Sequence, residues 1–197
     1  MKTTKLISLL ILFCITLCCE ASTISAKKNG NLSVKGTALV NEQGETVVLK
    51  GISYGWHNWW PRFYNASTVD YLAKSWGASV VRAAIGVDPD DGYIQNPEKA
   101  LACVQSVADA AIANDIYVII DWHSHHIRLE EAKQFFTQMA TRYKNVPNVI
   151  YEIFNEPVDD SWDAVKDYSI EIIKTIRAIE PNAIVLVGTP HWDQDIH

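Results

Sequence analysis

The sequence Val149-Ile-Tyr-Glu-Ile-Phe-Asn-Glu-Pro157 contains an apolar run that ends at asparagine, glutamate and proline. The run at 149–154 is short, rich in Val and Ile, and bounded by polar and turn-forming residues, which favours a strand over a helix. Because most consecutive positions are apolar, both faces of this strand are expected to be buried, as in a parallel sheet. Four further runs of this kind are predicted as strands: Val47–Ser53, Ser79–Ala84, Ile116–Trp122 and Ile184–Gly188.

Segments of helical periodicity separate these strands. Apolar residues recur there at spacings of three and four, at Ala100, Leu101, Val104, Val107, Ala108, Ala111 and Ile112, at Phe135, Phe136 and Met139, and at Ile172, Ile173, Ile176 and Ile179. Strand starts recur roughly every 31 to 37 residues, the size of one strand-and-helix unit with a right-handed crossover. Ser67–Asp70 resembles a helix start, and Leu32–Val40 is predicted to pair with Glu45–Leu49 as a hairpin around residues 41–44.

Two closures of such a β/α repeat are possible. An open doubly wound sheet suits five strands, but the strand-to-helix turns carry no G-x-G-x-x-G or G-x-x-x-x-G-K phosphate-binding sequence. A closed barrel takes about 250 residues, and the sequence stops just after its fifth strand. Polar and aromatic residues at the carboxyl end of strand after strand favour the barrel, because that end carries the active site. The predicted fold class is therefore α/β, a (β/α)8 TIM barrel of which about the first five units are present.

Composition excludes several classes of partner. The 197 residues carry Lys+Arg 17 against Asp+Glu 23, a formal net charge of -6, and 48% hydrophobic residues. These values are typical of a globular protein, and the absence of a basic run argues against nucleic acid or an anionic membrane as a partner. No cofactor is expected, and the complete protein is expected to be a monomer.

The first residues have the layout of a secretory signal peptide. Lys2 and Lys5 precede an apolar run at 6–19. At about 14 residues the run is shorter than the roughly 20 that span a bilayer, and small residues follow it. We expect a signal peptide at 1–21, with the cut as late as Ala26, and a secreted, extracellular product.

The domain that follows, residues 27–197, is expected to be the N-terminal part of a catalytic barrel, truncated after the fifth strand. Removing the signal peptide leaves Cys103 as its one cysteine, which the helical pattern predicts to be a small buried hydrophobe. Asn31 and Asn65 each begin a glycosylation sequon, a pattern that has meaning only in a secreted chain.

The chemistry is expected at the carboxyl ends of the strands. Polar and aromatic residues gather there at Tyr54–Trp60, Arg82, Asp121–His126, Asn155–Glu156 and Thr189–Trp192. Glu156 is the predicted centre: apolar walls would raise the pKa of a carboxyl at that place, which suits a general acid. Glu152 has the parity to point into the barrel, where Arg82 is its expected partner and its role is structural. Arg82 either holds a carboxylate in its ionised form or makes a surface salt bridge.

Aromatic residues are too numerous at this end for ordinary packing alone: Trp56, Trp59, Trp60, Tyr64, Trp122 and Trp192. Sugar rings stack on indole faces, which makes a carbohydrate the expected ligand, with core packing as the alternative for any one ring. His123, His125 and His126 with Asp121 are also a possible metal site, although a solvated loop or sugar hydrogen bonds explain them equally well.

The segment 149–157, with Leu49-Lys-Gly-Ile-Ser53, Val81-Arg-Ala-Ala84, Ile119-Ile-Asp-Trp-His123 and Val187-Gly-Thr189, closely resembles glycoside hydrolase family 5 endoglucanases. These cellulases occur in bacteria and plant-parasitic nematodes. The resemblance runs from about Leu49 to His197 and implies a (β/α)8 barrel. It also implies hydrolysis of internal β-1,4 bonds of cellulose with retention of the anomeric configuration.

Residue by residue, the resemblance assigns Glu156 as acid/base and Asn155 as the ligand of the sugar 2-hydroxyl. Arg82 matches the residue that orients the nucleophile, and His123 a contact in the same subsite. Trp59 and Trp192 match aromatic positions that stack glucosyl rings on either side of the cleavage point. No metal ligand is implied.

The sequence departs from the family pattern in two places. Gly55 stands where some members have a histidine, and His57 is not assigned that role. The family's nucleophile is a Glu on the seventh strand, which lies outside this sequence, whereas retention needs two carboxyls about 5 to 5.5 Å apart. An incomplete record of a secreted endoglucanase is the first hypothesis. The alternatives are a secreted glucan-binding remnant that cannot cut, and a metal-dependent hydrolase that uses His123, His125 and His126.

Overall fold

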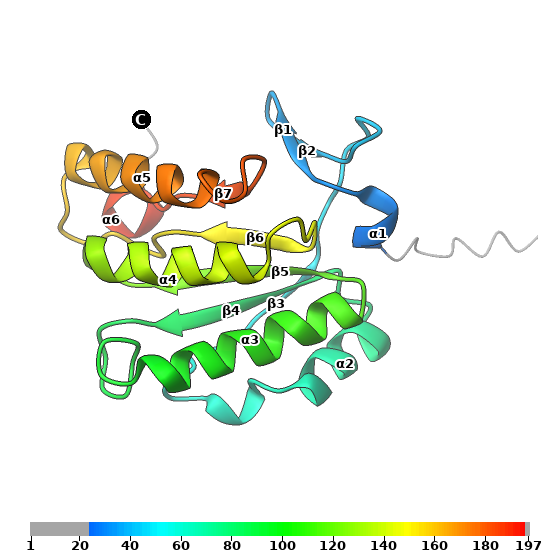
Figure 1. Ribbon diagram of the computed structural model, residues 1–197, viewed down its shortest axis with the longest axis horizontal. Helices are drawn as coiled ribbons and strands as arrows, with labels where there is room; N and C mark the ends of the chain where they lie inside the picture. Colours follow the sequence, from blue (N-terminus) through cyan, green and yellow to red (C-terminus); the bar gives the residue numbers. More distant parts are fainter. Residues whose placement is uncertain (1–23, 196–197) are drawn as a thin grey trace, which may run out of the picture.

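The computed structural model describes residues 24–195, so the predicted signal peptide at 1–21 lies outside the described residues. Its centre is a parallel sheet whose spatial order, β3-β4-β5-β6-β7, is also the chain order (Figure 1). The strands are β3 Gly51–Ser53, β4 Val80–Gly86, β5 Tyr117–His123, β6 Val149–Glu152 and β7 Ile184–Leu186. All five strands predicted from the sequence are therefore confirmed, with ends that differ by a few residues.

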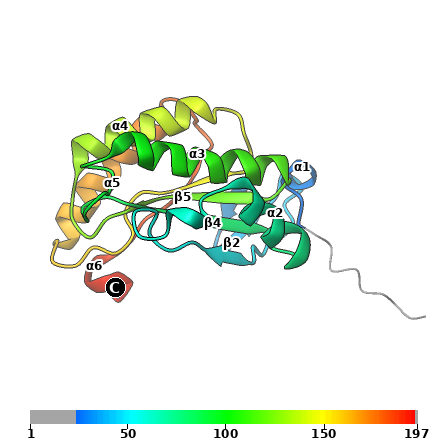
Figure 2. The same cartoon turned by 90° about the horizontal axis from the view of Figure 1, so that it is seen from below.

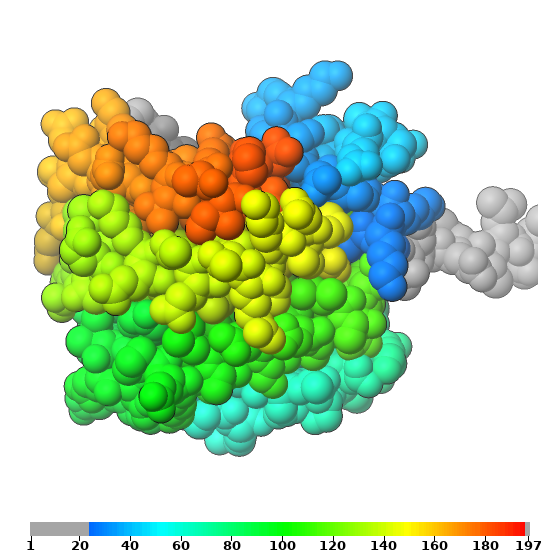
Figure 3. All heavy atoms as spheres, in the orientation of Figure 1, coloured from blue at the N-terminus to red at the C-terminus, as the bar shows by residue number. Residues whose placement is uncertain are grey.

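The helices between the strands decide between the two possible closures. They are α2 Ala66–Ser75, α3 Pro97–Ala113, α4 Leu129–Arg142 and α5 Trp162–Arg177. Helices α3, α4 and α5 lie on one side of the sheet (Figure 2), where they form a continuous outer surface (Figure 3). A doubly wound sheet has helices on both faces, whereas a barrel has them only outside. The architecture is the first five units of a (β/α)8 barrel.

The predicted helix start and the predicted hairpin both need correction in detail. Helix α2 begins two residues early, because the Asn65 side chain accepts a hydrogen bond from the Thr68 N–H at 3.0 Å and caps it. The segment predicted as one hairpin arm folds on itself instead: β1 Ser33–Lys35 pairs with β2 Ala38–Val40 across Gly36, whose φ is +62°. The expected pairing survives as one antiparallel bridge from Val40 to Thr46.

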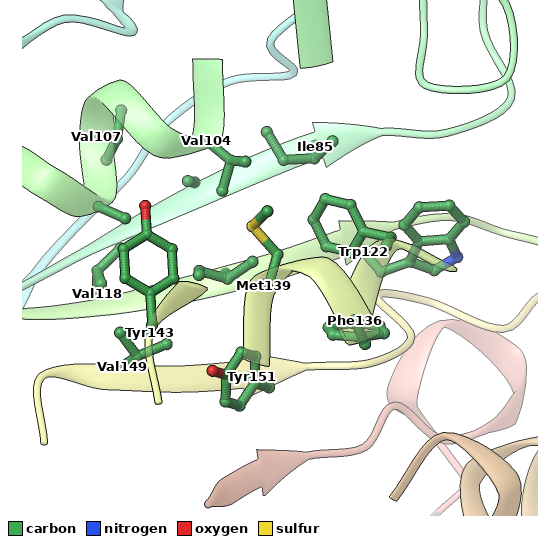
Figure 4. Close-up of a cluster of buried hydrophobic side chains, with 14 of the residues drawn as sticks. Ile85, Val104, Val107, Val118, Trp122, Phe136, Met139, Tyr143, Val149 and Tyr151 are labelled. Atoms are coloured by element: carbon green, nitrogen blue, oxygen red, sulfur yellow. The ribbon is translucent and has the colours of Figure 1, made fainter. Parts of the chain in front are cut away.

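The main hydrophobic core lies between the sheet and its helices (Figure 4). Side chains that point outward from β4, β5 and β6 meet those of α3 and α4 there, among them Ile85, Trp122, Tyr151, Val104, Phe136 and Met139. Trp122 is fully buried and packs on Phe135, which contradicts its prediction as a rim aromatic. Asp121 and His123 take the opposite face because side chains alternate along a strand. Cys103 packs against this core but is only partly buried, whereas its helical pattern predicts a buried residue.

The opposite, inner face of the sheet is less covered. Strands β3 and β7 each pair with one neighbour only in the described part of the chain, and Leu186, which lies opposite Glu152 in the strand register, is exposed. A hollow of about 790 Å³ lies between the β1–β2 hairpin and β7, at the amino end of the sheet. It is therefore remote from the strand ends that carry the polar clusters. Within residues 24–195 no helix is long and apolar enough to cross a membrane.

Candidate active site

The carboxyl ends of β4, β5 and β6 bring the predicted polar residues together. Asp121 on β5 lies opposite Glu152 on β6 in the strand register, and Ser53 on β3 lies opposite Arg82 on β4. Because these positions share one parity, their side chains point to the same inner face. Asn155 follows β6 by three residues and reaches the same group through its side chain.

Arg82 is the hub of this group. Its Nε and one Nη donate to the two carboxylate oxygens of Glu152, both at 2.7 Å, in a bidentate pair. The same Nη lies 2.8 Å from Asn155 Oδ1 and 2.9 Å from Asp121 Oδ2, and the other Nη donates to Ser53 Oγ at 3.0 Å. The expected Glu152 partnership is confirmed. The alternative of a surface salt bridge is wrong, because the Asp121 side chain is fully buried and that of Glu152 is nearly so.

His123 and Asp121 form a buried pair beside Arg82. His123 Nδ1 lies 2.6 Å from Asp121 Oδ2, and the ring packs edge-on against Trp56 with centroids 4.3 Å apart. Burial, with the charge of Arg82, lowers the pKa of His123 to about 4. The imidazole is therefore neutral near pH 7, and a neutral ring that donates from Nδ1 to Asp121 has its Nε2 free to accept a hydrogen bond. Such an acceptor suits a sugar hydroxyl.

Glu156 lies in the loop beyond β6, four residues past the last strand residue. Its side chain is 43% exposed. The expectation of apolar walls around this carboxyl is therefore wrong for the described part of the chain. The loop leaves the carboxyl partly exposed beyond the carboxyl end of β6. Its neighbours come from the loop after β5: the Ser124 carbonyl accepts from the Glu156 N–H at 3.4 Å, and His125 Nδ1 lies 3.2 Å from the Glu156 carbonyl oxygen.

The predicted aromatic platform divides into exposed and buried rings. Trp59 is 56% exposed on the loop that follows β3, and Trp192 is 51% exposed in the short helix α6 Pro190–Asp193, which follows β7. Trp56 stacks with Trp59, centroids 4.8 Å apart, and is half-buried. Tyr64 is buried, and its hydroxyl lies 2.8 Å from the carbonyl oxygens of Gly55 and Ala84, so it belongs to the core. Trp59 and Trp192 therefore keep the exposure that ring stacking requires.

The three histidines of the proposed metal site take different environments. His123 pairs with Asp121, His125 contacts Glu156, and His126 is exposed. Within residues 24–195 no group of three or more His, Cys, Asp or Glu side chains is placed to hold a metal ion. The alternative of a metal-dependent hydrolase therefore lacks its donor set here.

His57 is a residue of this region that the sequence reasoning left without a role. Its Nδ1 accepts a hydrogen bond from the Gly86 N–H at 3.0 Å, and its backbone N–H donates to the Ala84 carbonyl at 3.1 Å. These contacts tie the loop that carries Trp56 and Trp59 to the end of β4. A histidine between tryptophans gives no sequence signal of such a contact.

The stability of the chain is expected to depend on pH through His57. Burial, with the charge of Lys99, lowers its pKa to about 4 against the opposing charge of Asp91. A lowered folded-state pKa stabilises the protein above the unfolded value of about 6.5, and this stabilisation is lost as the pH falls toward 4. From pH 7 to pH 4.5, wild type should lose about 2–3 kcal/mol more unfolding free energy than His57→Asn, which keeps an acceptor but cannot titrate. Urea unfolding at both pH values measures this, and equal losses would contradict it.

Comparison with known proteins places this geometry in a family. The model of the family described as cellulase (glycosyl hydrolase family 5) matches residues 40–197. Endoglucanase Z of Dickeya dadantii is 43% identical over 190 residues, which are 95% of this chain and 44% of the relative. Endoglucanase A of Butyrivibrio fibrisolvens is 40% identical, covering 86% of this chain and 42% of the relative. The chain therefore spans less than half the length of these curated relatives.

Solved structures agree with the sequence comparisons. A structure from Cytophaga hutchinsonii superposes with a TM-score of 0.84 at 44% identity, over 86% of this chain and 56% of that one. The catalytic domain of a Thermobifida fusca endoglucanase gives a TM-score of 0.79 at 35% identity, over 86% and 57% of the two chains. A Glu-to-Gln variant of that domain has also been solved in complex with cellotetraose. The parallel sheet, the polar group at its carboxyl end and these matches together show that the chain belongs to the cellulases of glycosyl hydrolase family 5.

Proposed function

We propose that this chain is the N-terminal part of the catalytic barrel of a secreted endoglucanase, which hydrolyses internal β-1,4-glucosidic bonds of cellulose with retention. The observation that carries the proposal is the placement of Glu156 and Asn155 beyond β6, between the Arg82 group and the loop of Trp56 and Trp59. Family membership supports it, as does the cellotetraose complex of the Thermobifida fusca relative.

In the proposed reaction, Glu156 acts twice. A nucleophilic carboxylate from outside residues 1–197 attacks the anomeric carbon while Glu156 donates its proton to the glycosidic oxygen, which leaves as a hydroxyl of the departing sugar. Glu156 then takes a proton from water, and the water oxygen displaces the carboxylate from the anomeric carbon. Two inversions give net retention.

The other polar residues serve this chemistry by binding and orientation. Asn155 binds the 2-hydroxyl of the sugar beside the scissile bond, and its Oδ1 contact with Arg82 at 2.8 Å orients its amide nitrogen. The neutral His123 accepts from a hydroxyl in the same subsite. Arg82 opposes the rise that burial causes in the pKa of Glu152 and of Asp121, and its guanidinium places a positive charge near the position where the nucleophile must lie.

Product analysis of the native secreted protein tests this proposal. Cellotetraose is incubated with the enzyme inside a proton NMR tube, and the anomeric signals are followed before mutarotation. The β-anomer should appear first. An initial α-anomer would show inversion and overturn the proposed mechanism. If the protein does not lower the viscosity of a carboxymethylcellulose solution, the proposed endoglucanase activity is overturned. Amino-terminal sequencing of the same protein should find a first residue between 22 and 27 if the signal peptide is removed.

Glucan binding without cleavage is a second candidate function, because the exposed Trp59 and Trp192 form a binding surface that does not depend on a nucleophile. It predicts retention of the 197-residue chain on cellulose without release of reducing ends. Release of reducing ends by this chain alone would contradict it.

Both candidates predict that the two exposed tryptophans bind glucan. Trp59→Ala and Trp192→Ala should each weaken the affinity for cellohexaose about 5- to 10-fold, since an aromatic stacking contact contributes about 0.5–1.5 kcal/mol beyond its buried area. Isothermal titration calorimetry measures the change. Trp76→Ala is the matched control, because Trp76 is also exposed but follows α2 near the amino end of the sheet. Equal weakening in all three variants would show a loss of folding instead of a binding surface.

A further inference from the structure

Glu156 is not held in place by the sheet. Strand β6 ends at Glu152, so the candidate acid/base lies beyond the last ladder position. Its peptide is instead held by the loop that follows β5. The Ser124 carbonyl accepts from the Glu156 N–H, and the Ser124 hydroxyl is itself anchored 3.0 Å from Asp88 Oδ2 on the loop after β4.

His125 contacts the next peptide unit, the one that joins Glu156 to Pro157. Its Nδ1 lies 3.2 Å from the Glu156 carbonyl oxygen, which can only accept, so Nδ1 carries the hydrogen. The same Nδ1 lies 3.9 Å from the nearer carboxylate oxygen, Oε2. His125 thus contacts both the backbone and the reactive group of Glu156.

The ring of His125 is fixed by stacking. It lies against Trp56, with centroids 5.5 Å apart and planes at 27°, and Trp56 in turn stacks with the exposed Trp59. His125 therefore joins two parts of the site that come from different loops: the aromatic platform after β3 and the carboxyl after β6.

We propose that His125 is a positioning residue for Glu156, which sets the place of the acid/base relative to the sugar bound on the aromatic platform. The proposal rests on the proposed function, in which Glu156 donates a proton to the glycosidic oxygen. His125 touches neither the sugar nor the scissile bond in this role; it acts through the Glu156 peptide and through Trp56.

The dependence of the rate on the leaving group isolates this role. The 2,4-dinitrophenolate group of a 2,4-dinitrophenyl cellobioside leaves without being protonated. Loss of the acid should therefore leave kcat/KM for this substrate unchanged, whereas it should lower kcat/KM for cellotetraose. In the native protein that carries this chain, His125→Phe should lower kcat/KM about tenfold on cellotetraose and less than twofold on the dinitrophenyl substrate. A loss that is equal on both substrates would show a structural role and overturn the proposal.

Two further variants separate the hydrogen bond from the ring. His125→Asn keeps an N–H donor near the position of Nδ1 and should retain most of the activity on cellotetraose that His125→Phe loses. His126→Asn is the matched control, because this neighbouring histidine is exposed and its side chain makes no hydrogen bond in the described residues. It should leave both rates unchanged. If His125→Phe keeps activity on cellotetraose and His125→Asn loses it, the ring and not the hydrogen bond is what matters, and the hydrogen-bond argument is overturned.

A spectroscopic measurement on the 197-residue chain tests the contact without requiring activity. With ¹⁵N-labelled histidine at a pH where the rings are neutral, His125 should be the Nδ1–H tautomer. His57 is an internal control of opposite sign, because its Nδ1 accepts from Gly86 and its hydrogen must therefore be on Nε2. An Nε2–H tautomer at His125 would overturn the proposal.

Failure of this inference and failure of the proposed function give different results. If Glu156→Ala lowers kcat/KM on cellotetraose but not kcat/KM on the dinitrophenyl substrate, Glu156 is the acid. If His125→Phe then has wild-type kcat/KM on cellotetraose, only the positioning role of His125 is overturned. If Glu156→Ala shows no dependence on the leaving group, the proposed function itself is wrong.

Discussion

Replacing Glu156 with glutamine in the native protein should lower kcat on carboxymethylcellulose by about 10²–10⁴-fold. Glutamine has nearly the same shape and keeps the backbone contacts with Ser124 and His125, but it cannot donate or take a proton. Because a sugar hydroxyl is a poor leaving group, protonation of the glycosidic oxygen contributes much of the acceleration in the proposed reaction. The loss should therefore appear in kcat more than in KM.

The measurement is the initial rate of reducing-end release at several substrate concentrations. Glu130→Gln is the matched control, since Glu130 lies exposed on the first turn of α4 and pairs with Lys133 of the same helix. Azide sharpens the result: it needs no general base, so it should restore turnover of an activated cellobioside by Glu156→Ala and yield the β-glycosyl azide. A Glu156→Gln variant with wild-type turnover would remove Glu156 from the mechanism.

The order and type of the elements were predictable from the sequence because each strand is a short Val- and Ile-rich run. The strand ends were not. The pattern at 149–154 is apolar to Phe154, yet β6 stops at Glu152, where its ladders with β5 and with β7 both end. The prediction of 32–40 as a single hairpin arm is also wrong. Gly36 permits the tight turn between β1 and β2, and nothing in the apolar pattern marks this turn.

Strand parity explains which site residues were predictable. Within β5, Asp121 and His123 alternate with Trp122, and the parity that places the first two in the site buries the third among the helices. Applied to β5, this rule would have removed Trp122 from the predicted rim. The exposure of Glu156 and its contact with His125 depend on how two loops meet, and no local pattern in either loop encodes that meeting.

Replacing Arg82 with methionine is expected to lower the free energy of unfolding by about 3–5 kcal/mol. Methionine fills much of the same volume, so the loss comes from charge and hydrogen bonding. Burial acts against the charge of Arg82, but the hydrogen bonds to Glu152 and the charges of Asp121 and Glu152 raise its pKa overall. Without the guanidinium, both carboxylates stay buried with no cation beside them.

The deficit should also grow with pH. Burial raises the pKa of Glu152 and raises that of Asp121 to about 8, and in both cases Arg82 opposes the rise. Removing Arg82 therefore raises both folded-state pKa values further. A raised folded-state pKa favours folding below the unfolded value near 4, and this advantage is lost as the pH rises through the folded value. The variant should accordingly lose more stability relative to wild type at pH 8 than at pH 5.

Urea unfolding at the two pH values measures both effects. Arg142→Met is the matched control: its guanidinium also bonds an aspartate, Asp109 at 2.6 Å, but both groups are about half exposed and the pair should contribute at most about 1 kcal/mol. Adding Glu152→Gln to Arg82→Met should recover part of the loss, since it removes one of the two stranded charges. If Arg82→Met costs no more than the surface control at either pH, then Glu152 and Asp121 do not carry charge in the folded chain. The site would then have to be built on a neutral hydrogen-bond network, and Arg82 could not hold a further carboxylate in its nucleophilic form.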